Sequence, residues 1–241
     1  MKSLFLPLFA LGALATFSVQ LANASVGNRV QSMNFDVFLD DRVIGYQRFE
    51  LTQGGDGFRM QTRAKFKVKF LLITAFEYDH QNTEVWRGGC LQMIDSRTDS
   101  NGKMYTVSGQ VEGDVFLVET NEGKQKLDDC VSSFAYWDKD LLLQSQRLLN
   151  SQTGEYMAVR VETLGRDRMR VGDRDVSVDR YALLGKGLDI TLAYTVGGGV
   201  WVALDNKLDG GQMLSYRRSL TERVKPVGSK SALVGSLGAG L

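Results

Sequence analysis

Residues 58–70 read FRMQTRAKFKVKF, and two kinds of side chain alternate along them. The even-numbered residues are apolar or small apart from Thr62, whereas five of the residues between them are cations. Because successive side chains of a β-strand point to opposite faces, the alternation predicts a strand with one largely apolar face. A helix would mix the two sets around its surface, so the pattern favours a strand.

The regions on either side repeat this pattern in further segments. Turns rich in glycine and aspartate separate them, and DSNG at residues 99–102 is the strongest of these turns. Consecutive strands with one polar face predict a mainly β fold, with one strongly curved antiparallel sheet or an incomplete barrel. The expected strands are residues 35–39, 44–51, 76–86, 91–96, 105–111, 115–120, 156–163, 168–171, 176–184, 188–196, 200–204 and 213–220.

A single short helix is expected in the centre of the chain. Residues 134–149 contain several leucines with good helix formers between them. Asp138 is placed to cap a helix that starts near Lys139, and the turn-forming sequence NSQTG at residues 150–154 ends it.

The first residues predict an export signal. Lys2 provides a short basic start, residues 4–21 are almost entirely apolar, and the sequence ANA that ends at Ala24 fits a cleavage site. A retained membrane anchor is the alternative, which Pro7 and Gly12 weaken because they interrupt the apolar run. We expect cleavage near Ala24 and a location in a bacterial periplasm, or secretion.

Composition indicates one folded unit without a large net charge. Of the 241 residues, 43% are hydrophobic, which is enough for a packed core. There are 29 Lys and Arg residues against 28 Asp and Glu, so a nucleic-acid partner is not expected. We predict a signal peptide at 1–24, a single β-rich domain at 25–224 and a flexible tail rich in glycine and serine at 225–241.

The two cysteines, Cys90 and Cys130, predict one disulfide. Disulfides form in oxidising compartments, to which an export signal would send the chain. Two separated cysteines and one histidine make a poor metal site, and without a Cys-x-x-Cys pair a redox role is not expected.

Four groups of residues resemble a known family. They are FDVFLD at residues 35–40 with Ile44 and Gly45; YDH at 78–80 with Glu84, Trp86 and Leu91; Trp137 with LLNSQTG at 148–154; and Arg180, Tyr181 and Leu183 with Trp201, Val202 and Leu204. In this order they resemble a family of exported bacterial proteins catalogued only as a domain of unknown function. The resemblance covers most of residues 33–220 and implies a periplasmic β-rich protein without an established activity. More distantly, the layout is similar to the curved half-barrel of periplasmic lipoprotein carriers, which is an analogy of architecture alone.

The apolar face of residues 58–70, together with the strand that follows, is a candidate binding surface. The expected ligand contacts on this face are Phe58, Phe66, Phe70, Phe76, Tyr78, His80, Glu84 and Trp86. The alternative is that these side chains form ordinary core. An imidazole near a carboxylate suits a general base, but for His80 we favour a structural role, hydrogen-bonded within the sheet.

The opposite face of residues 58–70 is a candidate for anion binding. Phosphate groups of lipids, or another polyanion, suit such a row of cations. The alternative, which we favour, is a solvated face neutralised by Glu77 and Asp79 of the next strand. The cations are Arg59, Arg63, Lys65, Lys67 and Lys69.

Motifs of catalysis are missing from the sequence: it has no Gly-x-Ser-x-Gly, no His-Glu-x-x-His, no P-loop and no dinucleotide fingerprint. We therefore assign no catalytic residue, metal or cofactor, and expect a non-enzymatic binding or carrier protein for a lipid-like or hydrophobic ligand. Two alternatives stay open. One is an enzyme that acts on envelope glycans or lipids through His80 and carboxylates, and the other is a scaffold subunit bound to an envelope protein. The sequence assigns no oligomeric state.

Overall fold

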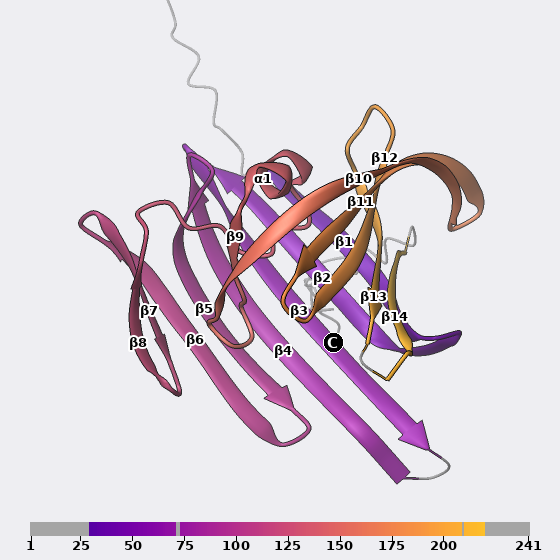
Figure 1. Ribbon diagram of the computed structural model, residues 1–241, viewed down its shortest axis with the longest axis horizontal. Helices are drawn as coiled ribbons and strands as arrows, with labels where there is room; N and C mark the ends of the chain where they lie inside the picture. Colours follow the sequence, from indigo (N-terminus) through magenta and orange to yellow (C-terminus); the bar gives the residue numbers. More distant parts are fainter. Residues whose placement is uncertain (1–28, 71–72, 209, 220–241) are drawn as a thin grey trace, which may run out of the picture.

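The computed structural model describes residues 29–70, 73–208 and 210–219, which form one antiparallel sheet of 14 strands (Figure 1). The first eight strands are β1 (Arg29–Leu39), β2 (Arg42–Gly54), β3 (Gly57–Phe70), β4 (Ile73–Arg87), β5 (Cys90–Ser100), β6 (Lys103–Glu112), β7 (Val115–Thr120) and β8 (Gly123–Leu127). A helix, α1 (Lys139–Gln144), comes next. The last six strands are β9 (Arg147–Leu149), β10 (Tyr156–Val171), β11 (Arg174–Gly185), β12 (Leu188–Thr195), β13 (Trp201–Lys207) and β14 (Met213–Arg218). The predicted signal peptide and tail lie outside the described residues.

The sheet consists of two meanders joined by the pairing of β1 with β14. The strand order is β8-β7-β6-β5-β4-β3-β2-β1-β14-β13-β12-β11-β10-β9, so β8 and β9 form its edges. The sheet is not closed into a barrel. In the described residues this confirms the predicted mainly β fold, with one curved antiparallel sheet and a single short helix.

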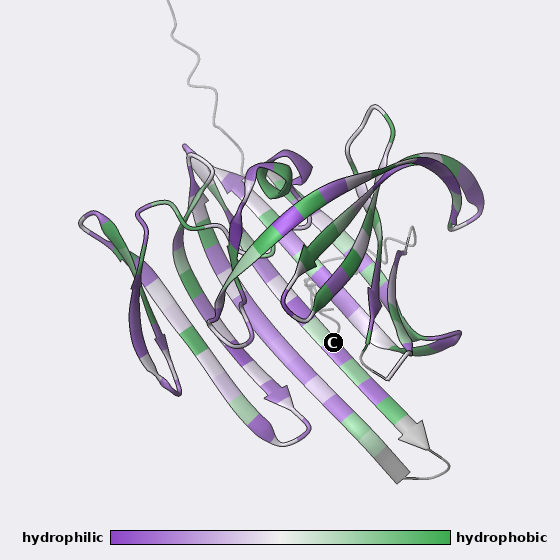
Figure 2. Ribbon diagram, viewed as in Figure 1, coloured by the Kyte–Doolittle hydropathy of each residue, from purple (hydrophilic) through white to green (hydrophobic). Residues whose placement is uncertain are grey.

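Strand β3 has the alternation that the sequence predicts. Met60, Ala64 and Phe66 are buried. Lys65, which lies between Ala64 and Phe66, and Lys67, which follows Phe66, are exposed. Figure 2 shows this as bands of opposite hydropathy along the strand. The buried side chains face the inside of the curved sheet.

The two meanders pack face to face. In Figure 1 the strands β10–β12 cross over the long strands β1–β3, and one hydrophobic cluster contains residues of both sets. Phe49 on β2 contacts Trp201 on β13 with ring centroids 5.3 Å apart, and Phe35 on β1 lies 4.1 Å from the same indole. Apolar burial between the meanders therefore curves the sheet around a shared interior.

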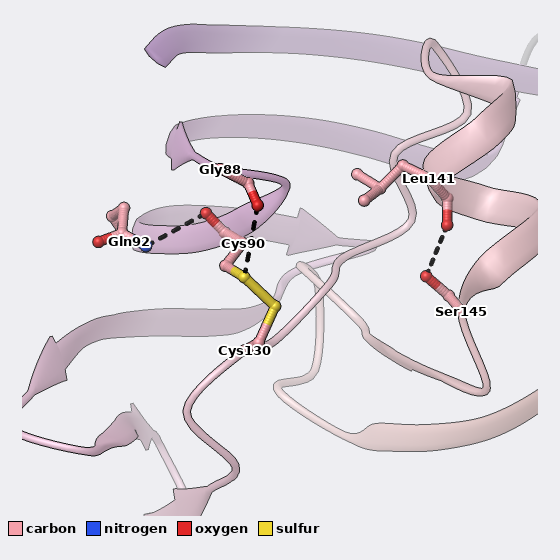
Figure 3. Close-up of a disulfide and its surroundings, with 6 residues drawn as sticks. All are labelled: Gly88, Cys90, Gln92, Cys130, Leu141 and Ser145. Atoms are coloured by element: carbon pink, nitrogen blue, oxygen red, sulfur yellow. Dashed lines mark hydrogen bonds between the residues drawn. A yellow bond between two sulfur atoms is a disulfide. The ribbon is translucent and has the colours of Figure 1, made fainter. Parts of the chain in front are cut away.

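Residues 131–150, which we call the inner segment, connect β8 to β10 and pack against both meanders. Trp137 contacts Phe58 of β3 with centroids 4.8 Å apart, and the Tyr194 hydroxyl of β12 donates to the backbone oxygen of Tyr136 at 2.8 Å. The Cys90–Cys130 disulfide, predicted from the sequence, fixes the start of this segment to β5 (Figure 3).

Helix α1 begins as predicted, with Asp138 as its cap. The Asp138 carboxylate accepts a hydrogen bond from the Leu141 backbone N–H at 3.0 Å. The helix ends at Gln144, earlier than the leucine pattern indicated, because Leu148 and Leu149 pair with β10 as strand β9. Leucine content alone does not distinguish a buried edge strand from another turn of helix.

Candidate functional site

A row of polar side chains on β4 points into the interior of the sheet. Tyr78, His80, Asn82 and Glu84 share one parity, and the last three are buried with 4–7% of their surface exposed. Polar residues are rarely so buried unless they are paired or have a functional role. The β3 residues opposite His80 and Asn82 are Ala64 and Thr62, which leave room above the row.

His80 is held as a neutral imidazole. Its Nδ1 lies 2.8 Å from the Thr98 hydroxyl oxygen on β5. Burial lowers the pKa of the imidazole to about 4, because the charged form would lose its hydration. His80 therefore carries no positive charge at neutral pH.

Glu84 is buried but surrounded by hydrogen-bond donors. One carboxylate oxygen accepts from Trp86 Nε1 at 3.0 Å, and the other accepts from Asn82 Nδ2 at 3.0 Å. Burial raises the pKa of the carboxyl group. His80 and Glu84 are bonded to different partners, with Asn82 between them, so these two side chains do not form an acid–base pair with each other.

Asn82 has an acceptor that the fold leaves unused. Its amide nitrogen faces the Glu84 carboxylate, which fixes the orientation of the amide group. Within the described residues, Asn82 Oδ1 has no hydrogen-bond partner, although only 7% of the residue is exposed. A buried acceptor without a hydrogen-bond partner lowers the stability of the folded state by about 1–3 kcal/mol. A ligand that donates to this atom would remove that penalty, so the atom is a candidate ligand contact.

These side chains line a cavity of about 260 Å³, which we call the inner chamber. One wall is formed by β2–β4, including Thr62, Ala64 and the polar row. The inner segment and β12–β14 form the rest, with Tyr136, Trp137 and Trp201 as the largest side chains. The chamber therefore requires residues that lie far apart in the chain.

A second cavity, the outer groove, has a volume of about 940 Å³ and adjoins the inner chamber. Its apolar lining includes Ile44, Val68 and Phe76, and charged Asp40, Arg42 and Lys67 also line it. Five residues line both cavities and form what we call the neck. They are Phe66, Tyr78, Gln152, Leu214 and Tyr216.

Aromatic contacts and one hydrogen bond shape the neck. The rings of Phe66 and Tyr78 are stacked with centroids 5.0 Å apart, and Tyr216 meets Phe66 edge-on at 6.1 Å. The Tyr78 hydroxyl donates to Gln152 Oε1 at 3.1 Å. Burial raises the pKa of Tyr78, so its hydroxyl keeps its proton.

The structure distributes the predicted ligand contacts over three places. Tyr78, His80, Glu84 and Phe66 line the inner chamber, and Phe76 lines the outer groove. Phe58 and Trp86 instead pack against Trp137 in the core. The side chain of Phe70 lies outside the described residues.

The predicted cationic row lies on the exposed outer face. Lys65 Nζ is 3.2 Å from the Asp79 carboxylate, and Lys67 Nζ is 3.4 Å from that of Glu77. Arg59 and Arg63 are exposed, whereas the side chain of Lys69 lies outside the described residues. Anion binding by this row stays a prediction, and solvent screens exposed ion pairs of this kind.

Several chamber residues were not among the predicted contacts. Asn82 has the same parity as His80 and Glu84, so it lies on the same inward face of β4. A polar residue at an inward position is the signal that could have identified it as a candidate contact. Ser133, Tyr136 and Tyr216 reach the chamber from distant parts of the chain, and no local pattern indicates them.

The described part of the chain lacks the features of a metal site and of a membrane-spanning helix. Within it, no group of three or more His, Cys, Asp and Glu side chains could hold a metal ion. In the same residues, no helix has the length and apolarity to cross a membrane.

Comparison with known proteins places the chain in a family. Residues 35–219 match a domain of unknown function, DUF6134. The chain belongs to this family. None of the curated proteins matches it. A crystal structure from Brucella abortus, a β-barrel-like protein of the domain of unknown function DUF1849, is similar to this chain with a TM-score of 0.54 and 13% identity. The match covers 78% of this chain and 94% of that one, and at this identity it shows the fold alone.

Proposed function

We propose that this DUF6134 protein is a non-enzymatic binding or carrier protein that holds a lipid-like ligand in the outer groove and inner chamber. The supporting observation is the apolar groove of about 940 Å³, which adjoins the polar chamber at an aromatic neck. Ligand sites commonly have volumes of 300–1,000 Å³, mostly apolar walls and a few polar groups that fix orientation. An amphiphile fits this arrangement, with its chain along the groove.

We further propose that the protein acts in the periplasm. The disulfide between Cys90 and Cys130 is consistent with an exported protein, because such bonds persist in oxidising compartments. The basic and apolar start of the sequence is the second support. A periplasmic location would place the groove close to envelope lipids.

Native mass spectrometry of protein purified without detergent tests the proposal. We expect a bound amphiphile, and we expect the uncharged fluorescent probe N-phenylnaphthylamine to bind and to displace it. Val43→Glu should weaken probe binding, because it adds a carboxylate to the lining of the groove.

Val30→Glu is the matched control. Val30 and Val43 are both exposed, at 54% and 65%, but Val30 is not among the residues that line the groove. Probe binding should therefore be unchanged by Val30→Glu. Absence of both a bound amphiphile and probe binding would overturn the proposal, as would equal losses of binding in the two variants.

A further inference from the structure

The inner chamber differs from the outer groove in its charge. Of the described residues that line the chamber, none is Lys, Arg or Asp, and Glu84 is the one acidic residue. Its carboxyl group accepts hydrogen bonds from Asn82 and Trp86, so it is satisfied within the fold. The remaining polar lining consists of hydroxyl, amide and indole groups and His80.

A negatively charged ligand group would be strongly disfavoured in this chamber. A buried anion requires a cation or several donors to offset its lost hydration, which costs several kcal/mol. His80 does not supply the cation, because its buried imidazole is neutral above about pH 4. Glu84 would repel an anion when ionised and offers no positive charge in either protonation state.

The chamber does offer an acceptor for a hydrogen-bond donor. Asn82 lines the chamber, and its Oδ1 is buried without a hydrogen-bond partner among the described residues. The Glu84 carboxylate holds the amide so that the oxygen, rather than the nitrogen, remains available. A ligand hydroxyl or N–H at this point would satisfy the acceptor and remove the penalty of leaving it unpaired.

We propose that the ligand is an uncharged amphiphile whose hydroxyl or amide N–H donates to Asn82 Oδ1 in the inner chamber, while its apolar chain follows the outer groove. This inference rests on the proposed binding function and specifies the class of ligand. The proposal excludes ionised fatty acids and phospholipids whose head group lies in the inner chamber. Arg42 and Lys67 line the outer groove and not the inner chamber. They would therefore lie near the apolar chain of the ligand and not near its polar group.

Competition against N-phenylnaphthylamine at pH 8 tests this class with three ligands of the same chain. Oleyl alcohol is uncharged and carries a donor, methyl oleate is uncharged without a donor, and oleate is ionised. We expect oleyl alcohol to displace the probe at about a tenfold lower concentration than methyl oleate, since the alcohol can donate to the unpaired acceptor and the ester cannot. Oleate should be the weakest competitor.

Two variants locate the effect. Asn82→Leu should make oleyl alcohol and methyl oleate equal while the probe still binds. Ser96→Ala is the control, because the Ser96 hydroxyl is also buried without a partner among the described residues, but it is not among the chamber residues. The tenfold preference should survive in Ser96→Ala.

The outcomes separate the two proposals. If the wild-type protein neither carries an amphiphile nor binds the probe, the proposed function itself fails. If the probe binds but oleate competes as well as oleyl alcohol, for example with its carboxylate held by Arg42 and Lys67 at the rim, the ligand class is wrong and the binding function stands. The wild-type competition decides this even if Asn82→Leu does not fold.

Discussion

The stability of the protein should depend on the protonation of His80, which is the one histidine in the chain. In the folded state, burial holds the imidazole pKa at about 4, against an ordinary value of 6.5 in the unfolded chain. Between these values the unfolded state binds more protons, so its free energy falls relative to the folded state as the pH falls. The contribution of His80 to stability is fully present above pH 6.5 and is lost towards pH 4.

The magnitude follows from the two pKa values. Each pKa unit corresponds to about 1.4 kcal/mol, so acidification from pH 7 to pH 4 should remove about 3 kcal/mol of unfolding free energy through this side chain. His80→Gln keeps a polar group beside Thr98 but does not titrate. The variant should therefore lose about 3 kcal/mol less than the wild type over the same pH range.

Urea unfolding measured by tryptophan fluorescence at several pH values provides the comparison, because Trp86 and Trp201 are fully buried. Glu84 acts in the opposite direction. Its raised pKa means that protonation on acidification favours the folded state, but this contribution is present in both proteins and cancels in the difference. Parallel stability curves for wild type and His80→Gln would refute the assignment of a buried neutral imidazole.

Three further changes test the supports of the fold. Replacing Cys90 and Cys130 by serine should lower the free energy of unfolding by about 4 kcal/mol, since the disulfide closes a separation of 40 residues; identical urea curves for the two proteins would contradict this. Asp138→Ala should cost about 1 kcal/mol, because the Leu141 N–H loses its acceptor, and circular dichroism melting measures the cost. Gly45→Ala should lower the melting temperature, since the added Cβ would overlap a backbone carbonyl of β3; an unchanged melting temperature would show that β2 and β3 can separate without penalty.

The fold could be predicted from sequence because its strands repeat a strong local pattern. In β3 each exposed cation alternates with a buried side chain, and the turn at residues 99–102 has the chemistry of a hairpin, with Asn101 and Gly102 at positive φ. Strand β8 was not predicted, because its residues are almost all exposed and carry no alternation. The expected break in β10 is a continuous strand with an irregular register at Gly165.

The candidate site could be predicted only on the wall formed by β3 and β4, where Phe66 was also an expected ligand contact. Tyr78, His80 and Glu84 share a parity that the sequence reveals, and the structure places all three along the inner chamber. The opposite wall depends on the pairing of β1 with β14 and on the path of the inner segment. Both are long-range features, so residues such as Ser133 and Tyr216 have no signal in their own neighbourhood.

The position of the polar row favours a role beyond stability. A sheet with apolar residues at positions 80, 82 and 84 would satisfy the same alternation and would avoid an unpaired buried acceptor. His80, Asn82 and Glu84 are consecutive inward positions of one strand, next to the neck that leads to the apolar groove. The buried residues Thr62, Ser96 and Thr98 lie opposite this row on the neighbouring strands β3 and β5. Buried polar residues that cluster beside a cavity are typical of functional sites. Buried polar residues that serve only to fix strand register do not need to lie beside a cavity. The unused Asn82 oxygen is the point at which these two explanations differ, because the backbone pairing of β4 with β3 and β5 already fixes the register.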